Sequence, residues 1–163
     1  MIEVYIMPVG SEDSANRMHT TLLNSINRQK ILEYGTTPPG NSYENYKVNV
    51  WGLTPGPQNT RQWERFKPND IVIFVPSNSD LMVTEIIQTF RNKGLAKELW
   101  DIDDHGQTWE LMFFVKELGT VGKTKRTFLS ELGYSENDRL QGNRRITEIF
   151  FSKYNSIENL LNS

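Results

Sequence analysis

Residues 99–118 read LWDIDDHGQTWELMFFVKEL and join a polar loop to an apolar segment. The segment Trp109–Val115 predicts a strand, because its apolar run is short and rich in aromatic side chains. Alternate side chains of a strand share one face, so every second residue from Trp109 onward forms an apolar face. The loop Trp100–Gly106 comes before this strand, and a tryptophan therefore stands near each edge of the loop.

Strand and turn signals continue on both sides of this stretch. Strands are predicted at residues 3–7, 47–51, 71–75 and 81–87, and helices at 60–66, 94–99, 124–132 and 157–161. A further helix after Gly10 is predicted to bury one face made of Met18, Leu22, Leu23 and Ile26. Pro8 and Gly52 are expected to end the strands before them, and Thr60 is expected to cap its helix. Hairpins and short helices predict an α+β domain built on a curved mixed sheet or partial barrel with short flanking helices.

The composition indicates one folded domain over residues 1–163. Hydrophobic residues make up 37% and aromatic residues 11% of the chain, which is enough for a core. The chain has no cysteine, which excludes disulfides and thiolate chemistry. No apolar run reaches membrane-spanning length, so we expect a cytoplasmic protein with no membrane partner. The net charge of −2 means that nucleic acid would be bound by a local patch. The abrupt end at residues 155–163 suggests a fragment of a longer protein.

Motifs that resemble enzymatic or metal sites are incomplete. Gly122-Lys123-Thr124 looks like the end of a phosphate-binding loop, but Glu117 stands where that loop needs its first glycine. Residues 101–106 resemble the start of a calcium loop, but Met112 stands where a bidentate glutamate is needed. The chain holds only two histidines, too few for a clustered zinc site. We therefore expect no catalytic residue, no metal, no cofactor and no enzymatic activity in this chain.

The four tryptophans fall into two groups. Trp63 shares one side of a predicted helix with Phe66, which favours ordinary packing. Trp51, Trp100 and Trp109 stand at strand ends or loop edges, where a ring can project into a pocket or into the core. The face of such a ring can stack on a flipped base, and a methyl group on that base gains apolar contact in place of water. A modified-base pocket and simple core packing are therefore the two alternatives for these three residues.

The order and spacing of several segments resemble one known family. The segments are VNVWG at 48–52, QWERFKPNDIVIF at 62–74, LW at 99–100, TWELMFFV at 108–115, LGY at 132–134 and LQG at 140–142. This pattern covers about residues 47–147 and is similar to the EVE/YTH-like branch of the PUA-like superfamily. It also resembles the N-terminal DNA-recognition domains of Mcr-type modification-dependent restriction systems. The resemblance implies a PUA-like fold and a reader that flips methyladenine or methylcytosine into an aromatic cage.

The resemblance also implies which residues would hold the base. Trp51 and Trp100 would form walls of the cage. Trp109 would be a third wall or the floor. The backbone groups of Gly52 and Leu53 would read the base edge by hydrogen bonds, together with Asn49 or Asp101. Asn41 and Asn45 compete with Asn49 for an asparagine that often precedes the first cage strand.

A basic segment could contact the phosphates beside a flipped base. Its six members are Lys123, Lys125, Arg126, Arg139, Arg144 and Arg145. The alternative is a charged surface that serves only solubility.

Four functions agree with these features. The first is recognition of methylated DNA as a specificity domain, with motor and nuclease activities on a separate domain or subunit. The second is recognition of a methylated base in RNA. The others are a protein-interaction module whose tryptophans lie in the core and an enzyme that acts on a small molecule.

Overall fold

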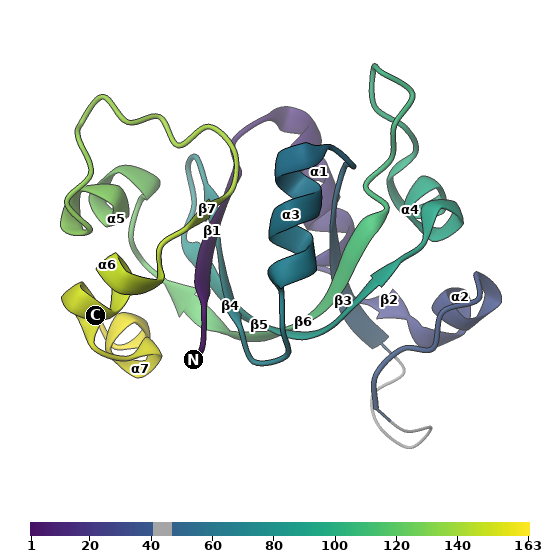
Figure 1. The fold of residues 1–163 in the computed structure, drawn as a ribbon, viewed down its shortest axis with the longest axis horizontal. Helices are drawn as coiled ribbons and strands as arrows, with labels where there is room; N and C mark the ends of the chain where they lie inside the picture. Colours follow the sequence, from purple (N-terminus) through teal and green to yellow (C-terminus); the bar gives the residue numbers. More distant parts are fainter. Residues whose placement is uncertain (41–46) are drawn as a thin grey trace. The chain divides into compact units, whose positions relative to one another are not determined.

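Seven strands form one mixed sheet in residues 1–40 and 47–163, the part of the chain that this computed structural model describes (Figure 1). The strands are β1 (Val4–Val9), β2 (Ile26–Asn27), β3 (Lys47–Leu53), β4 (Ile71–Pro76), β5 (Leu81–Arg91), β6 (Leu111–Val121) and β7 (Arg144–Arg145). The helices are α1 (Glu12–Thr21), α2 (Arg28–Glu33), α3 (Pro57–Arg65), α4 (Lys93–Trp100), α5 (Lys125–Glu131), α6 (Thr147–Tyr154) and α7 (Ile157–Leu161).

The sheet combines parallel and antiparallel pairs. Its hydrogen-bonded order is β2-β3-β6-β5-β4-β1-β7, and over the described residues this order is open. β1 pairs with β4 in parallel, whereas β3 with β6 and β4 with β5 are antiparallel. The predicted α+β class, with a mixed sheet and short flanking helices, is confirmed.

The contacts between residues divide the chain into two compact units. The first unit consists of Met1–Ala15, Asn69–Glu85 and Glu117–Ser163, and the second of Asn16–Pro68 and Ile86–Lys116. β5 and β6 contribute residues to both units. The single domain with a core at residues 47–147 stays a prediction. Within the described ranges, no helix has the length and apolar character needed to span a membrane.

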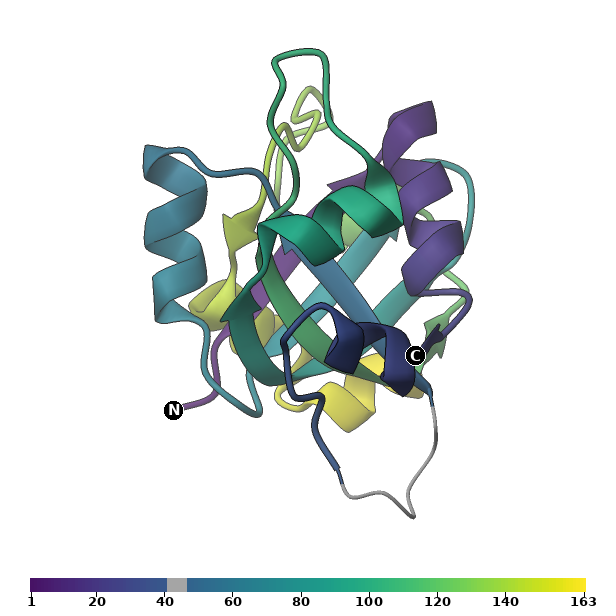
Figure 2. The same ribbon diagram turned by 90° about the vertical axis from the view of Figure 1, so that its right-hand side faces the viewer.

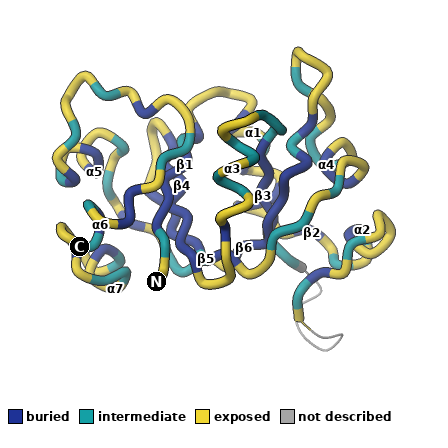
Figure 3. Tube along the Cα trace, viewed as in Figure 1, coloured by how far each residue is buried: buried dark blue, intermediate teal, exposed yellow. Residues whose placement is uncertain are grey.

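The first unit is built around the parallel strands β1 and β4. Every residue of β4 is buried, and Figure 3 shows this strand in dark blue. Its core cluster joins both strands to α5 and α6 and includes Val4, Ile6, Ile71, Ile73, Phe128 and Phe150. The side chain of Thr124 caps α5 by accepting from the backbone N–H of Thr127, and Gly133 follows the helix with a φ of 93°. The predicted helix at 124–132 is thus confirmed.

The second unit is built around the antiparallel strands β3 and β6. Alternate side chains of a strand point to opposite faces of the sheet. One face packs under α2 and α4, which lie in front of the sheet in Figure 2. The members of this cluster include Val50, Met112, Phe114, Ile31, Leu95 and Ala96. Near α3, Phe66 meets Phe113 edge to face, and the Nε1 of Trp63 donates to the carbonyl oxygen of Met112 at 3.0 Å.

Two strands run further than the sequence predicts. β1 continues through Pro8 to Val9, because the missing N–H of Pro8 points to the side of β7, which pairs only with Tyr5 and Ile6. β3 continues through Gly52 to Leu53, because its ladder with β6 extends over both residues. Trp51 therefore lies inside a strand and not at its end.

Other boundaries also differ from the prediction. α3 begins at Pro57 and not after Thr60, because proline fits the first turn of a helix, where its missing N–H needs no partner. α1 ends at Thr21, so Leu23 is 62% exposed and Ile26 lies in β2. β6 begins at Leu111, two residues after Trp109. α2 and α6 were not predicted from the sequence.

Candidate functional site

Three of the four tryptophans lie together in the second unit. Trp51 lies in β3, Trp100 is the last residue of α4, and Trp109 precedes β6. The ring centroid of Trp100 is 6.1 Å from that of Trp51 and 6.4 Å from that of Trp109. These three residues form the tryptophan cluster. The structure thus brings together the three side chains that the resemblance assigns to one site.

The rings of the tryptophan cluster meet edge to face. The interplanar angle is 67° between Trp51 and Trp100 and 80° between Trp100 and Trp109. Such contacts are favourable for packed aromatic pairs, but neither provides two parallel faces that could sandwich a base. Trp51 is only 4% exposed, whereas Trp100 and Trp109 are half-buried. The accessible aromatic surface of the cluster therefore belongs mainly to Trp100 and Trp109.

Gly52 permits the close packing of this cluster. A Cβ atom at position 52 would lie 2.2 Å from the carbonyl oxygen of Trp109 and 3.0 Å from Cζ3 of Trp100. A contact of 2.2 Å with backbone is far inside van der Waals separation, so any other residue would have to displace the backbone of Trp109. The structure therefore gives Gly52 a steric role, and the reading of a base edge by its backbone stays a prediction.

Trp100 carries a buried polar atom. Its Nε1 has no hydrogen-bond partner among the described residues. Buried indole N–H groups usually have a partner. An acceptor on a bound molecule could satisfy this donor.

A guanidinium group covers part of the tryptophan cluster. The Cζ atom of Arg17, in α1, lies 4.0 Å from the ring centroid of Trp109 and 5.6 Å from that of Trp51. Both distances are within the range of cation–π interactions. Sequence reasoning missed Arg17, because no motif marks it and its only local signal is its place beside the apolar Met18. Folding brings α1 to β3 and so places Arg17 on the cluster.

The side chain of Asn49 is engaged in the fold. Its Nδ2 donates to the carbonyl oxygens of Thr21 and Leu22, at 3.2 Å and 3.0 Å. These bonds tie the end of α1 to β3. Asn41 and Asn45 lie outside the described residues.

Asp101 directly follows Trp100 and is exposed. Its φ is 64° and its ψ is −148°, a strained combination outside the left-handed helical region that few residues other than glycine adopt. Its carboxylate accepts from the backbone N–H of Ile102 at 2.9 Å, and its carbonyl oxygen accepts from the hydroxyl of Thr108 at 3.0 Å. These bonds shape the loop between two of the clustered rings. Leu53, by contrast, is buried in β3.

Two of the six predicted phosphate-binding residues pair with acids of the first unit near α5. The Nζ of Lys123 lies 2.7 Å from the carboxylate of Glu131. Burial raises the pKa of Glu131, but hydrogen bonds from Lys123 and Tyr154 outweigh it, so the net shift of that pKa is downward. Arg144 donates twice to the carboxylate of Asp138, at 2.8 Å and 3.2 Å, and these bonds lower the pKa of Asp138.

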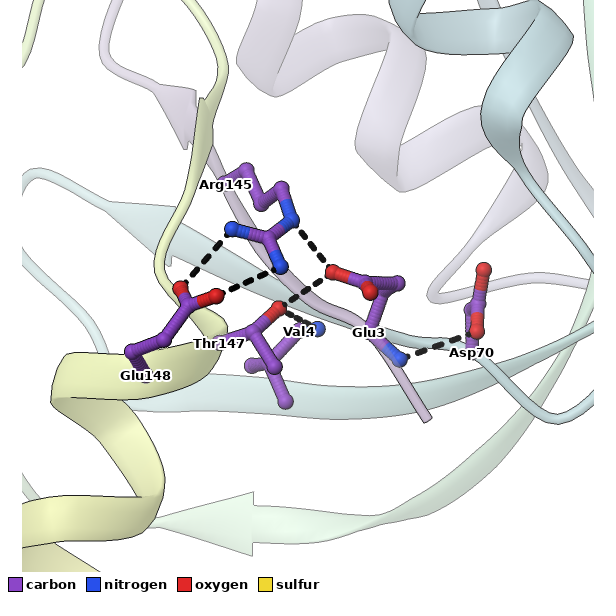
Figure 4. A network of polar contacts seen from close by, with 6 residues as sticks. All are labelled: Glu3, Val4, Asp70, Arg145, Thr147 and Glu148. Carbon is purple, nitrogen blue, oxygen red and sulfur yellow. Dashed lines mark hydrogen bonds and ion pairs between the residues drawn. The ribbon is translucent and has the colours of Figure 1, made fainter. Parts of the chain in front are cut away.

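Arg145 is also held in a network within the first unit (Figure 4). Its guanidinium makes two bonds of 2.8 Å to the carboxylate of Glu148 and one to the carboxylate of Glu3. The hydroxyl of Thr147 donates to Glu3 at 2.7 Å and accepts from the backbone N–H of Val4 at 2.9 Å. Arg145 thus joins the start of β1 to the start of α6.

The remaining three predicted phosphate-binding residues line one cavity of the first unit. This cavity of about 640 Å³ lies between α5 and residues 134–139, and Lys125, Arg126 and Arg139 contribute to its lining. The Nζ of Lys125 donates to the carbonyl oxygen of Arg139 at 2.9 Å. The lining also contains Glu131 and Asp138, whose charges are neutralised by the ion pairs above. Of the lining acids this leaves Glu136 to oppose the three cations. The excess charge of this cavity is therefore positive.

The described residues contain no group of three or more histidine, cysteine, aspartate or glutamate side chains that could hold a metal ion.

The comparisons with known proteins find a similar fold among solved structures. No protein-family model and no curated protein matches the sequence. Among solved structures, the N-terminal domain of Thermococcus gammatolerans McrB bound to m5C DNA is similar, with a TM-score of 0.74 and 16% sequence identity. The match covers 98% of this chain and 99% of that domain. The chain therefore has the α+β fold of an McrB N-terminal domain, which confirms the predicted resemblance at the level of the fold.

Proposed function

We propose that this chain recognises a methylated base in DNA and that the tryptophan cluster is its base-binding site. One observation carries the proposal: Trp51, Trp100 and Trp109 converge in a chain whose fold is that of a domain solved with m5C DNA.

Stacking provides the energy for this recognition. An aromatic ring that stacks on a base contributes about 1–3 kcal/mol, similar to the cost of extruding the base from a duplex. A methyl group adds apolar contact, and so tips the balance toward the modified base. Trp100 and Trp109 expose ring surface for this contact, while the buried Trp51 supports them from β3.

Hydrogen bonds would then read the edge of the base. The carboxylate of Asp101 is exposed and lies next in sequence to Trp100, so it is the side chain that we favour for this role. The backbone of Gly52 and Leu53 remains a second source of polar groups. The amide of Asn49 already donates to two carbonyl oxygens, and it would read a base only through its remaining acceptor.

The charged cavity of the first unit supplies the proposed phosphate contacts. Lys125, Arg126 and Arg139 carry its excess positive charge. Removal of one cation that binds a phosphate should reduce the slope of log affinity against log salt by about 0.9. We therefore expect this reduction in Arg126→Ala and in Arg139→Ala. Arg145→Ala, which breaks a structural network, should lower stability and leave the slope unchanged.

The proposed role is recognition alone. We infer that motor and nuclease activities reside on partner domains or subunits in the cytoplasm, and that this chain itself is not an enzyme.

The test is a comparison of duplexes that differ in one methyl group. Affinities would be measured at one low salt concentration for duplexes with 5-methylcytosine, N6-methyladenine or no modification. We expect wild-type protein to prefer one methylated duplex by about tenfold, and Trp109→Ala to lose this preference. Trp63→Phe is the matched control, because Trp63 lies in the same unit but outside the tryptophan cluster.

Two results would change the assignment. Equal affinity of the wild-type protein for all three duplexes would reject methyl recognition in DNA. Preferential binding of a methylated RNA of the same sequence would make the chain an RNA reader.

A further inference from the structure

We propose that Arg17 is a plug of the tryptophan cluster, which a base must displace to enter. In the unliganded protein its guanidinium occupies the face of Trp109 on which the base would stack. This inference rests on the proposed function and adds a residue that controls access to the same site.

The distances support competition between Arg17 and a base. The Cζ of Arg17 lies 4.0 Å from the ring centroid of Trp109, which is the separation of two planar groups in van der Waals contact. A guanidinium is planar and delocalised and stacks on aromatic rings as a base does. The same group is 5.6 Å from the ring centroid of Trp51. A base and Arg17 therefore cannot occupy this face of Trp109 together.

A base can gain this face of Trp109 only by displacing the side chain of Arg17, because the groups around it are fixed. Trp51 is almost fully buried, and the rings of Trp100 and Trp109 contact each other edge to face. Gly52 leaves no space for the backbone of Trp109 to shift toward β3. Arg17 is half-buried in α1, and displacing its long side chain from the ring needs no change in the backbone.

A plug lowers the apparent affinity for the base. Only the fraction of molecules with Arg17 off the ring can accept a base, and the apparent dissociation constant rises in proportion. This loss of affinity applies to a duplex whose base is flipped onto the ring. It does not apply to a duplex held only through its phosphates. Removal of Arg17 should therefore strengthen binding of a duplex whose methylated base stacks on the ring, and leave unchanged the binding of a duplex held only through its phosphates.

The test uses the ratio of affinities for methylated and unmodified duplexes. Any attraction of Arg17 to phosphates affects both duplexes and cancels in this ratio. We expect Arg17→Ala to raise the ratio by about threefold to tenfold, the effect of removing its cation–π contacts with the cluster. Arg17→Lys keeps the charge without the planar group and should raise it less. Arg61→Ala removes an exposed arginine of the same unit and should leave the ratio unchanged.

Every outcome separates the plug from the proposed function. A lower ratio in Arg17→Ala would show that Arg17 is a wall of the site, and an unchanged ratio would place it outside the site; either result overturns the plug alone. If the wild-type protein itself has no methyl preference, the proposed function is rejected. Alanine is the best helix former, so loss of folding is not expected, and a cooperative unfolding transition would verify this. Acrylamide should also quench tryptophan fluorescence more strongly in unliganded Arg17→Ala than in wild type.

Discussion

At the scale of single residues, Gly52 shows how one missing side chain shapes the tryptophan cluster. The residue pairs with Met112 in the ladder of β3 and β6, and its α-carbon faces the backbone of Trp109. The backbone of Trp109, directly before β6, cannot yield as the end of a flexible side chain can. The cluster therefore depends on the absence of a Cβ atom at this position.

We predict that Gly52→Ala lowers the free energy of unfolding by about 1–3 kcal/mol, the usual cost of overpacking. The same change should reduce the methyl preference, because it displaces Trp109 and Trp100. Denaturant unfolding would measure the first effect. Gly122→Ala is the control, because a Cβ atom there meets nothing within 4 Å. Equal unfolding midpoints for the two variants would contradict this account.

At the scale of elements, α4 is held at its start by Asn92. Its Oδ1 caps the helix by accepting from the backbone N–H of Leu95 at 2.9 Å. Its Nδ2 donates to the carbonyl oxygen of Tyr34 and to the hydroxyl of Thr36, at 2.8 Å and 2.7 Å. One side chain thus joins α4 to the segment after α2. Because α4 ends at Trp100, this anchor also positions the tryptophan cluster.

Removal of this anchor should affect both stability and binding. We predict that Asn92→Ala lowers the free energy of unfolding by about 1–2 kcal/mol and weakens the methyl preference. Thr124→Ala removes the equivalent cap from α5 and should cost about 1 kcal/mol without a change in the preference. Chemical denaturation and duplex titration of both variants would check this. If both variants showed the same weaker preference, general destabilisation would explain the result instead of α4.

At the scale of the whole molecule, the two units have different proposed roles in binding DNA. The second unit contains the tryptophan cluster and Arg17, and the first contains the cations around its cavity. The ion pairs of the first unit also make its stability depend on pH. Hydrogen bonds from Arg145 lower the pKa of Glu148, as those from Arg144 lower that of Asp138.

We predict that acid destabilises the protein. A carboxyl group with a pKa that is lower in the folded state stabilises the fold above its ordinary pKa, which is 4.5 for Glu131 and Glu148 and 3.8 for Asp138. This contribution is lost as the pH falls through the folded values. The free energy of unfolding should therefore change little between about pH 7 and 5 and fall by about pH 3. Denaturant titrations at these values would test this, and Asp138→Asn should weaken the dependence.

Several features of the fold could be predicted from the sequence. The strand at 71–75, the helix at 124–132 and the α+β class depend on local apolar patterns, caps and turns, which operate over a few residues. The three tryptophans of the cluster also stand out as large rings beside turns. Their assignment to one site depended on the resemblance, because spacing along the chain does not specify distance in space.

Composition and local periodicity were thus enough for the class of the fold, and the family resemblance was needed to group the three tryptophans into one candidate site. Tertiary structure alone placed Arg17 on the rings and gave Gly52 its steric role. It also distinguished ion-paired cations such as Arg144 from the cations that line the cavity. It also extended β1 through Pro8 and β3 through Gly52. The physical reason is common to all of these: each depends on a partner far away in the sequence, and that partner is set by strand register and helix packing, which leave no local signal.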